Sequence, residues 1–333
     1  MIESDIKSEA ADDLVLGSCG LRFEGIDHKD LKRILSKLNT PGRDRRHRKC
    51  RRLNSFDAEI ARLSSSTKIL RLQFKGNDGI GDEGMKHLHL IPASVRDIDF
   101  SECKLSCDGI TTLCKWMEGN GHIHRLILQG NEMNDEATKA VGRMLSHNKC
   151  LQELSIDPLA DAEDEPLVSW EAAVAICTGL HQNPDHKLRR LRFCVSNFSD
   201  VDEYIWYLVF ARLLPSETTL QVLEIASRLN FTTPYDTIFM LGRRIETVCG
   251  FWLKAAQRLE SIHRIDACVI KYFRSDEIHY YLDLNRYRAR QLVSREGLSD
   301  RIWLVAMAKA CEGGSLDVVY YFLQNKPHLC DRR

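Results

Sequence analysis

The chain has 333 residues, 44% of them hydrophobic, so it can bury a sizeable core in one elongated domain or in two compact ones. Its 47 basic and 47 acidic side chains leave no net charge, which excludes a global field that would recruit nucleic acid or an anionic membrane. The N-terminal stretch MIESDIKSEAADDL is unlike a signal peptide, and no apolar run approaches the roughly 20 residues of a membrane span.

These features lead us to expect a monomeric cytoplasmic protein, with the nucleus as an alternative and with no membrane partner. The twelve cysteines include no Cys-x-x-Cys pair, and several fall at apolar positions of periodic segments. We therefore expect reduced, buried thiols rather than a framework of disulfides.

Residues 1–66 are expected to form an N-terminal cap or a degenerate copy of the repeat that follows. The segment LVLGSCGL aligns with that repeat through Leu14, Leu16, Cys19 and Leu21. A helix is expected from about Asp27 to Leu38, ending near the stretch NTPG. The residues leave open whether this segment is a true copy or a plain cap.

A basic segment, residues 42–52, follows that helix. It contains seven cationic side chains within ten residues, interrupted by one Asp: Arg43, Arg45, Arg46, Arg48, Lys49, Arg51 and Arg52. Such density suits phosphates, RNA or nuclear import receptors, but no aromatic residue is interleaved to stack bases. A solvated surface loop, an import or partner signal, and direct nucleic-acid contact are the three interpretations, in that order of preference.

One apolar pattern recurs over residues 67–230. An apolar residue is followed by a second three positions later, a third two positions after that, and a small or amide residue three positions further on. The four clear copies begin 26, 28 and 28 residues apart, at Ile69, Val95, Ile123 and Leu151. Weaker copies begin at Leu188 and Leu220. Each copy predicts a short strand, a turn and an amphipathic helix, because alternate side chains of a strand share one face.

This pattern resembles the leucine-rich repeats of the ribonuclease-inhibitor-like class, whose signature L-x-x-L-x-L-x-x-N/C-x-L precedes a helix. Asn131 with Met133, and Cys103 with Leu105, match the second half of that signature. The resemblance implies an α/β right-handed solenoid with parallel strands on the concave side, helices outside and a mostly helical C-terminal cap. The Asn or Cys is expected to turn inward and satisfy backbone groups at the strand exit. The fourth copy departs from the signature, with Leu159 in the Asn or Cys position.

The third, fifth and seventh positions of each copy are expected to point away from the core. Their charge alternates from strand to strand, which predicts cross-strand ion pairs and a surface of mixed polarity. We hypothesise that this surface binds an unidentified protein partner, although a lattice that only keeps the sheet paired and soluble explains the same residues. The candidate binding residues are Arg71, Gln73, Lys75, Asp97, Asp99, Arg125, Ile127, Gln129, Glu153, Arg190 and Arg192.

Residues 231–333 are expected to hold a degenerate repeat and a mostly helical cap. A strand is predicted near Ile262 to Val269, whereas the segment EIHYYLDLN fits either a strand or a helix. The tail predicts a helix, a Gly-Gly turn and a second helix capped by Ser315. This tail looks like one ankyrin helix pair, but it lacks the Thr-Pro-Leu-His opening, so a capping helical hairpin is the preferred interpretation.

Residues 79–84 imitate a cofactor loop. The spacing Gly79-x-Gly81-x-x-Gly84 is that of a dinucleotide-binding loop, and Asp97 and Asp99 lie on the next predicted strand. However, Gly79 comes late after its strand, the following helix is short, and the same pattern recurs without the glycines. Nucleotide binding here is a remote alternative.

The sequence otherwise predicts no enzyme, cofactor or metal site. It contains no P-loop, G-x-S-x-G or H-E-x-x-H motif, and the pair His122-x-His124 lacks a completing ligand. Acidic residues at the strand-to-helix turns, such as Asp82, are expected to stabilise helix N-termini rather than to form a rim for a metal or a basic partner.

Overall fold

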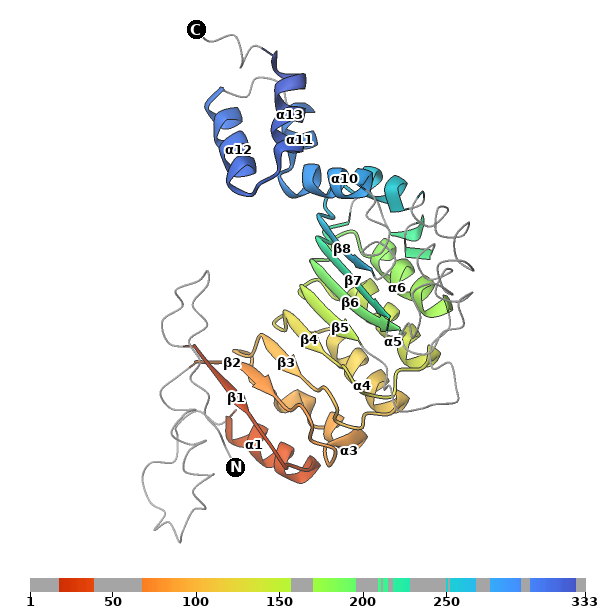
Figure 1. The fold of residues 1–333 in the computed structure, drawn as a ribbon. Coiled ribbons are helices and arrows are strands. Elements are labelled where there is room, and N and C mark those ends of the chain that lie inside the picture. The colour runs from red at the N-terminus through yellow and green to blue at the C-terminus, as the bar shows by residue number, and fades with distance from the viewer. Residues whose placement is uncertain are drawn as a thin grey trace, which may run out of the picture. The chain divides into compact units, whose positions relative to one another are not determined.

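The computed structural model describes residues 18–38, 68–156, 170–195, 209–210, 212–214, 218–227, 250, 252–267, 276–294 and 300–327. The basic segment and the departing turn after the fourth strand copy lie outside these residues. The chain divides into two compact units, Met1–Leu188 and Arg189–Arg333. It is an α/β protein, in which the strands of each unit are parallel and follow one another in chain order (Figure 1).

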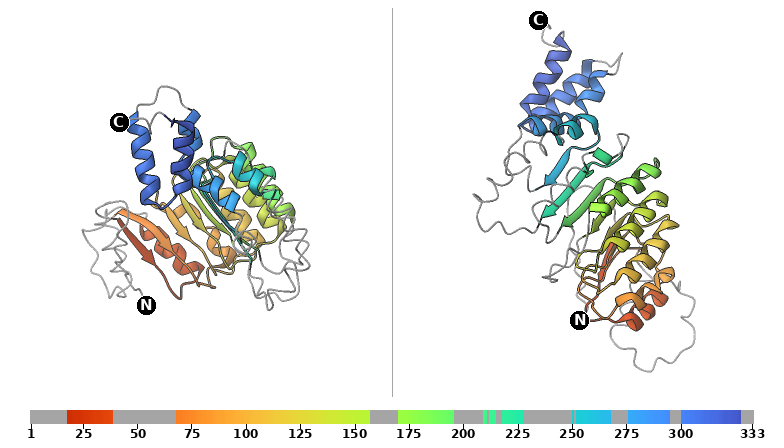
Figure 2. Two further views of the ribbon diagram at one scale, coloured as in Figure 1. Left: turned by 45° about the horizontal axis from the view of Figure 1, so that its top comes forward. Right: turned by 90° about the vertical axis from the view of Figure 1, so that its right-hand side faces the viewer.

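The first unit alternates strands with helices, as the repeat predicts. Figures 1 and 2 show its helices along one side of its strands. Its elements are β1 (Ser18–Arg22), α1 (His28–Leu38), β2 (Lys68–Gln73), α3 (Gly81–Met85), the 3-10 helix η1 (Leu88–Leu90), β3 (Asp97–Asp99), α4 (Cys107–Glu118), β4 (Arg125–Ile127), α5 (Asp135–His147), β5 (Glu153–Ile156) and α6 (Trp170–Gln182).

The apolar positions of neighbouring strands form rows in the core of this unit. The fourth position of the pattern gives a row of side chains that are at most 1% exposed: Leu72, Ile98, Leu126 and Leu154. At the sixth position the ring of Phe74 stacks between those of Phe23 and Phe100, with both centroid distances 5.2 Å. Full burial of such side chains contributes about 1.5–3 kcal/mol each, which only neighbouring copies can provide for one another.

The structure corrects the alignment of the first copy, which the sequence placed on Leu14, Leu16, Cys19 and Leu21. Leu21 instead pairs with Leu72, so this strand lies seven residues later than predicted. Phe23 then fills the sixth position and is buried. The physical reason is the turn: Gly25 has φ of 66° and Gly76 has φ of 77°, a left-handed conformation that glycine adopts without strain. The expected helix after this turn is confirmed as α1.

The second unit begins with three parallel strands and continues in helices. Its described elements are β6 (Arg190–Val195), β7 (Val222–Ser227), β8 (Arg264–Ala267), α10 (Asp276–Arg286), α11 (Ala289–Ser294), α12 (Asp300–Glu312) and α13 (Leu316–Asn325). The strand predicted near Ile262 is confirmed as β8. The ambiguous segment EIHYYLDLN is helix α10, and Ile278, Leu282 and Asn285 are buried at helical spacing.

The predicted tail of two helices and a Gly-Gly turn is confirmed as α12 and α13. Their core contains Trp303 and Phe322, whose rings meet edge to face at 5.5 Å. The expected role of Ser315 is wrong in one respect. This residue precedes α13, but its hydroxyl donates to the carboxylate of Asp283 at 3.1 Å and makes no capping hydrogen bond.

Candidate functional site

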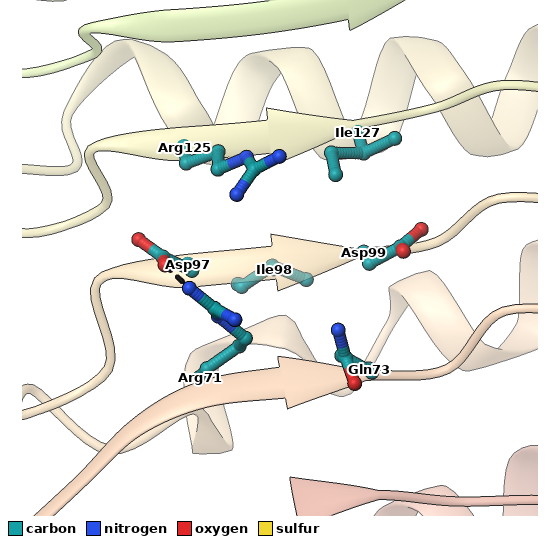
Figure 3. Close-up of a pocket in the computed structure, with 7 residues that line it drawn as sticks. All are labelled: Arg71, Gln73, Asp97, Ile98, Asp99, Arg125 and Ile127. Atoms are coloured by element: carbon teal, nitrogen blue, oxygen red, sulfur yellow. Dashed lines mark hydrogen bonds and ion pairs between the residues drawn. The ribbon is translucent and has the colours of Figure 1, made fainter. Parts of the chain in front are cut away.

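The outward side chains of β2, β3 and β4 meet in one shallow pocket (Figure 3). Strand pairing places them in two rows across the sheet. One row is Arg71, Asp97 and Arg125, and the other is Gln73, Asp99 and Ile127. Together with Ile98, these residues line a volume of about 290 Å³, which we call the sheet-face pocket. Strand alternation explains why the two rows point outward, because the residues between them, Leu72, Ile98 and Leu126, are buried and at most 1% exposed.

Cross-strand ion pairs connect the first row, as the alternating charges predict. The Nε atom of Arg71 lies 3.2 Å from Oδ2 of Asp97, and that of Arg125 lies 3.3 Å from an oxygen of Glu153. These side chains are between 26% and 43% exposed. Each such pair therefore contributes about 0–1 kcal/mol to the free energy of unfolding. Its larger effect is to hold the charged groups in fixed positions on the surface of the sheet.

Asp99 in the second row is bonded differently. Its Oδ1 atom accepts hydrogen bonds from the backbone N–H and the hydroxyl of Ser101, at 2.9 and 2.5 Å. Within the described part of the chain, no cationic side chain forms an ion pair with Asp99. The pocket therefore presents a partly exposed carboxylate whose Oδ2 atom has no hydrogen-bond or ion-pair partner among the described residues.

The structure brings six of the predicted binding residues together in this pocket. Lys75 and Gln129 follow β2 and β4, where they bond to Glu102 at 3.3 Å and to Ser155 at 2.8 Å. Glu153 opens β5. Arg190 and Arg192 belong to the second unit, where Arg192 lies 3.8 Å from Glu224. The seven cationic residues of the basic segment, Arg43 to Arg52, lie outside the described residues.

Buried polar side chains hold the turns that end these strands. Three of them, the strand-exit ladder, occupy the ninth position of the pattern: Asn77, Cys103 and Asn131. Oδ1 of Asn131 accepts from the backbone N–H groups of Cys103 and Leu105, at 3.1 and 3.0 Å. Its amide nitrogen donates to the carbonyl oxygens of Phe100 and Leu128, at 2.8 and 3.0 Å. The expected inward role of this position is confirmed, and it links each copy to the preceding one.

Cys103 makes the corresponding contact with a thiol. Its Sγ atom donates to the carbonyl oxygen of Phe74 at 3.1 Å. Burial raises the pKa of this thiol to about 12. The side chain is therefore a structural, protonated group, in keeping with the expected reduced thiols.

A second row of asparagines, at the helix exits, was not predicted. The amide nitrogen of Asn148 donates to the carbonyl oxygens of Met117 and Asn120, at 2.6 and 3.2 Å. That of Asn183 donates to those of Leu145 and Asn148, both at 2.8 Å. The signal in the sequence is that Asn120 and Asn148 each stand three residues before a strand copy, 28 residues apart.

The glycines of residues 79–84 have local structural roles. Gly81 has φ of 46°, and a Cβ atom on Gly84 would collide with Ile80 and contact Leu31. Three backbone N–H groups of the loop already donate to protein carbonyl oxygens, those of Ile80, Gly81 and Gly84. The following helix α3 has only five residues, and the sequential strand order offers no switch point for a dinucleotide. This geometry does not favour nucleotide binding.

The acidic turn residues bond within the protein. Oδ1 and Oδ2 of Asp82 accept from the backbone N–H and the hydroxyl of Ser106, at 2.9 and 2.5 Å. Asp27 accepts from two backbone N–H groups at the start of α1, and the bond from Asp30 contributes most to lowering its carboxyl pKa. Among the described residues, no group of three or more His, Cys, Asp or Glu side chains could hold a metal.

His122 and His124 lie before β4, and burial lowers the pKa of both imidazoles.

None of the helices that the structure describes is both long enough and apolar enough to cross a membrane. No protein-family model matches the chain, and no curated protein shows significant sequence similarity to it.

Proposed function

We propose that this chain is a non-catalytic leucine-rich-repeat scaffold that binds a protein partner through the strand side of its first unit. The observation that carries this proposal is the sheet-face pocket, to which three successive strands contribute outward side chains in register. The strand-exit ladder supports the assignment to leucine-rich repeats, because its members stand where the signature places Asn or Cys.

The charge pattern of the pocket favours a protein over a polyanion. A nucleic acid requires a surface of one sign, whereas here basic and acidic side chains alternate across neighbouring strands. The same rows include the apolar side chain of Ile127 and the amide of Gln73. Protein interfaces combine such polar and apolar groups over one patch.

Affinity capture from native lysate followed by mass spectrometry tests this function. The wild-type chain is compared with the double variant Asp99→Arg/Arg125→Glu, which reverses two partly exposed charges of the pocket. A matched control reverses the exposed helix pair Glu136 and Lys139, whose charged atoms are 2.7 Å apart. We expect at least one partner that wild type and control retain and the pocket variant loses. Equal recovery of every partner by all three proteins would contradict the proposal.

A nuclear or nucleic-acid-associated factor is the second candidate function. It rests on the density of the basic segment, with seven cationic side chains between Arg43 and Arg52. Such a role predicts RNA or DNA binding near physiological salt that weakens steeply as salt is raised. Replacing the arginines of the segment with serine should remove this binding. Binding that is absent, or that survives the replacement, rejects this candidate.

A further inference from the structure

We propose that the sheet-face pocket receives one basic side chain, arginine or lysine, of the partner protein. This inference rests on the proposed function and adds the chemistry of the group that the pocket recognises. Its basis is the pairing of charges and hydrogen bonds among the residues that line the pocket.

The ion pairs of the pocket leave one negative charge without a partner. Arg71 is paired with Asp97 and Arg125 with Glu153, so these four charges compensate one another. Asp99 has no cationic partner among the residues that the structure describes. The carboxylate of Asp99 therefore attracts a positively charged ligand, whereas it repels a phosphate or a carboxylate.

The hydrogen bonds show which atom of Asp99 is free to bind. Ser101 donates twice to Oδ1, which uses both acceptor sites of that oxygen. Oδ2 keeps its acceptor capacity. A ligand should therefore bring N–H donors to this single oxygen rather than span both oxygens of the carboxylate.

The two neighbours of Asp99 complete the site. Gln73 and Ile127 are its register partners on either side, and neighbouring strands lie about 4.8 Å apart. Figure 3 shows the side chains of all three residues on the open side of the strands. A basic side chain that binds Asp99 can thus place its aliphatic stem against Ile127, while Gln73 borders the site on the other side. Basic side chains combine these two features, a charged donor group and an apolar stem.

Methyl NMR of the full chain provides the direct test. The δ1 methyl of Ile127, assigned through an Ile127→Val variant, reports on the pocket during titration with the acetylated and amidated heptapeptide Ala-Val-Ser-Arg-Ser-Val-Ala. We expect a saturable shift, and about fivefold weaker binding when citrulline, the neutral analogue, replaces arginine. Replacing arginine with lysine should preserve the shift, and replacing it with glutamate should remove it.

Two variants locate the effect. Asp99→Asn keeps a carbonyl oxygen for Ser101 but removes the charge, so the preference for arginine over citrulline should disappear. Glu102→Gln is the matched control, because this nearby exposed carboxylate already pairs with Lys75 at 3.3 Å. The control should retain the preference. If both variants reduce the preference for arginine over citrulline equally, the preference reflects the general negative charge of this surface and the proposal is overturned.

Further outcomes separate this inference from the proposed function. No shift with the arginine peptide up to about 10 mM, or equal shifts with arginine and citrulline, overturns the basic-side-chain site. If the capture experiment nevertheless yields a partner that depends on the pocket, the scaffold function stands and only its recognition chemistry is wrong. If the peptide result is positive but no pocket-dependent partner is captured, the site stands and the scaffold function fails.

Discussion

Buried asparagines hold turns in both units, but their amides are bonded to different extents. Asn131 in the first unit uses both ends of its amide, accepting from two backbone N–H groups and donating to two carbonyl oxygens. In the second unit, Oδ1 of Asn285 is buried and has no hydrogen-bond partner among the residues that the structure describes. Its nitrogen donates to the carbonyl oxygens of Ala256, Leu259 and Ile262. Both side chains therefore link a segment to the one before it, but Asn131 satisfies N–H and carbonyl groups together, whereas Asn285 satisfies carbonyl groups alone.

The largest expected effect on a polar contact comes from removing these amides. Asn131→Ala leaves two buried N–H groups and two carbonyl oxygens without partners, so it should lower the free energy of unfolding by about 4 kcal/mol. Asn285→Ala should lower the free energy of unfolding by about 2 kcal/mol. This variant removes the donor of three carbonyl groups, but it also removes an oxygen that had no hydrogen bond. Hydrogen exchange resolves the two units separately and measures both losses. Equal losses would show that the two turns depend on their asparagines to the same extent.

A second prediction concerns the close approach of α5 and α6, for which the second unit shows no equivalent among its described helices. A Cβ atom on Gly179 would collide with the backbone carbonyl of Gly142, and one on Gly142 would lie 2.5 Å from the carbonyl oxygen of Ala175. Gly179→Ala should therefore destabilise the first unit by about 2 kcal/mol. The control is Gly119→Ala, where nothing lies within 4 Å. A cost for Gly179→Ala no larger than that of the control, by urea unfolding, would mean that the helices can separate without loss.

The strand positions of the first unit could be predicted from sequence because their pattern combines two independent signals. Alternation placed Leu72, Ile98 and Leu126 inward, and the spacing of copies aligned one strand with the next. The pocket residues follow directly from that alignment. The bonding of Asp99 could not be predicted, because it depends on a rotamer and on the hydroxyl of Ser101.

The misaligned first copy and the undecided segment EIHYYLDLN have equally local causes. Cys19 and Leu21 imitate the end of the signature, and only the left-handed turn at Gly25 distinguishes the true alignment. The alternation in EIHYYLDLN is accidental, since Ile278 and Leu282 are also four residues apart on one face of a helix. A short apolar segment satisfies both periods, and packing decides between them.

The third prediction uses pH to distinguish the units. His186 in the first unit is 4% exposed, and burial lowers its pKa below the ordinary value of 6.5. The unfolded chain then binds more protons than the folded one between the folded pKa and 6.5. The contribution of the neutral His186 side chain to the free energy of unfolding is therefore complete above pH 6.5, and it is lost as the pH falls through the pKa of the folded state.

Urea unfolding of the first unit at pH 7.5 and pH 5 measures this loss. The variant His186→Gln should show a smaller loss over the same interval, whatever its stability at pH 7.5. His263 in the second unit also has a pKa lowered chiefly by burial. The loss of stability that His263 causes in the second unit at low pH should therefore be the same in His186→Gln as in wild type. An unchanged pH dependence in His186→Gln would assign the loss to other groups.

The smallest expected effect lies on the helical hairpin of the second unit. Leu316 is 73% exposed and Tyr320, one helical turn later, is 66% exposed, whereas Phe322 on the same helix is fully buried. Leu316→Ser removes little buried apolar surface, so the free energy of unfolding should change by less than about 0.5 kcal/mol. Phe322→Ala, in contrast, should cost about 3–5 kcal/mol because it opens a cavity beside Trp303. Urea unfolding followed through tryptophan fluorescence measures both variants. A loss above about 1.5 kcal/mol for Leu316→Ser would mean that this side chain is covered in the folded protein, because an exposed leucine cannot contribute so much.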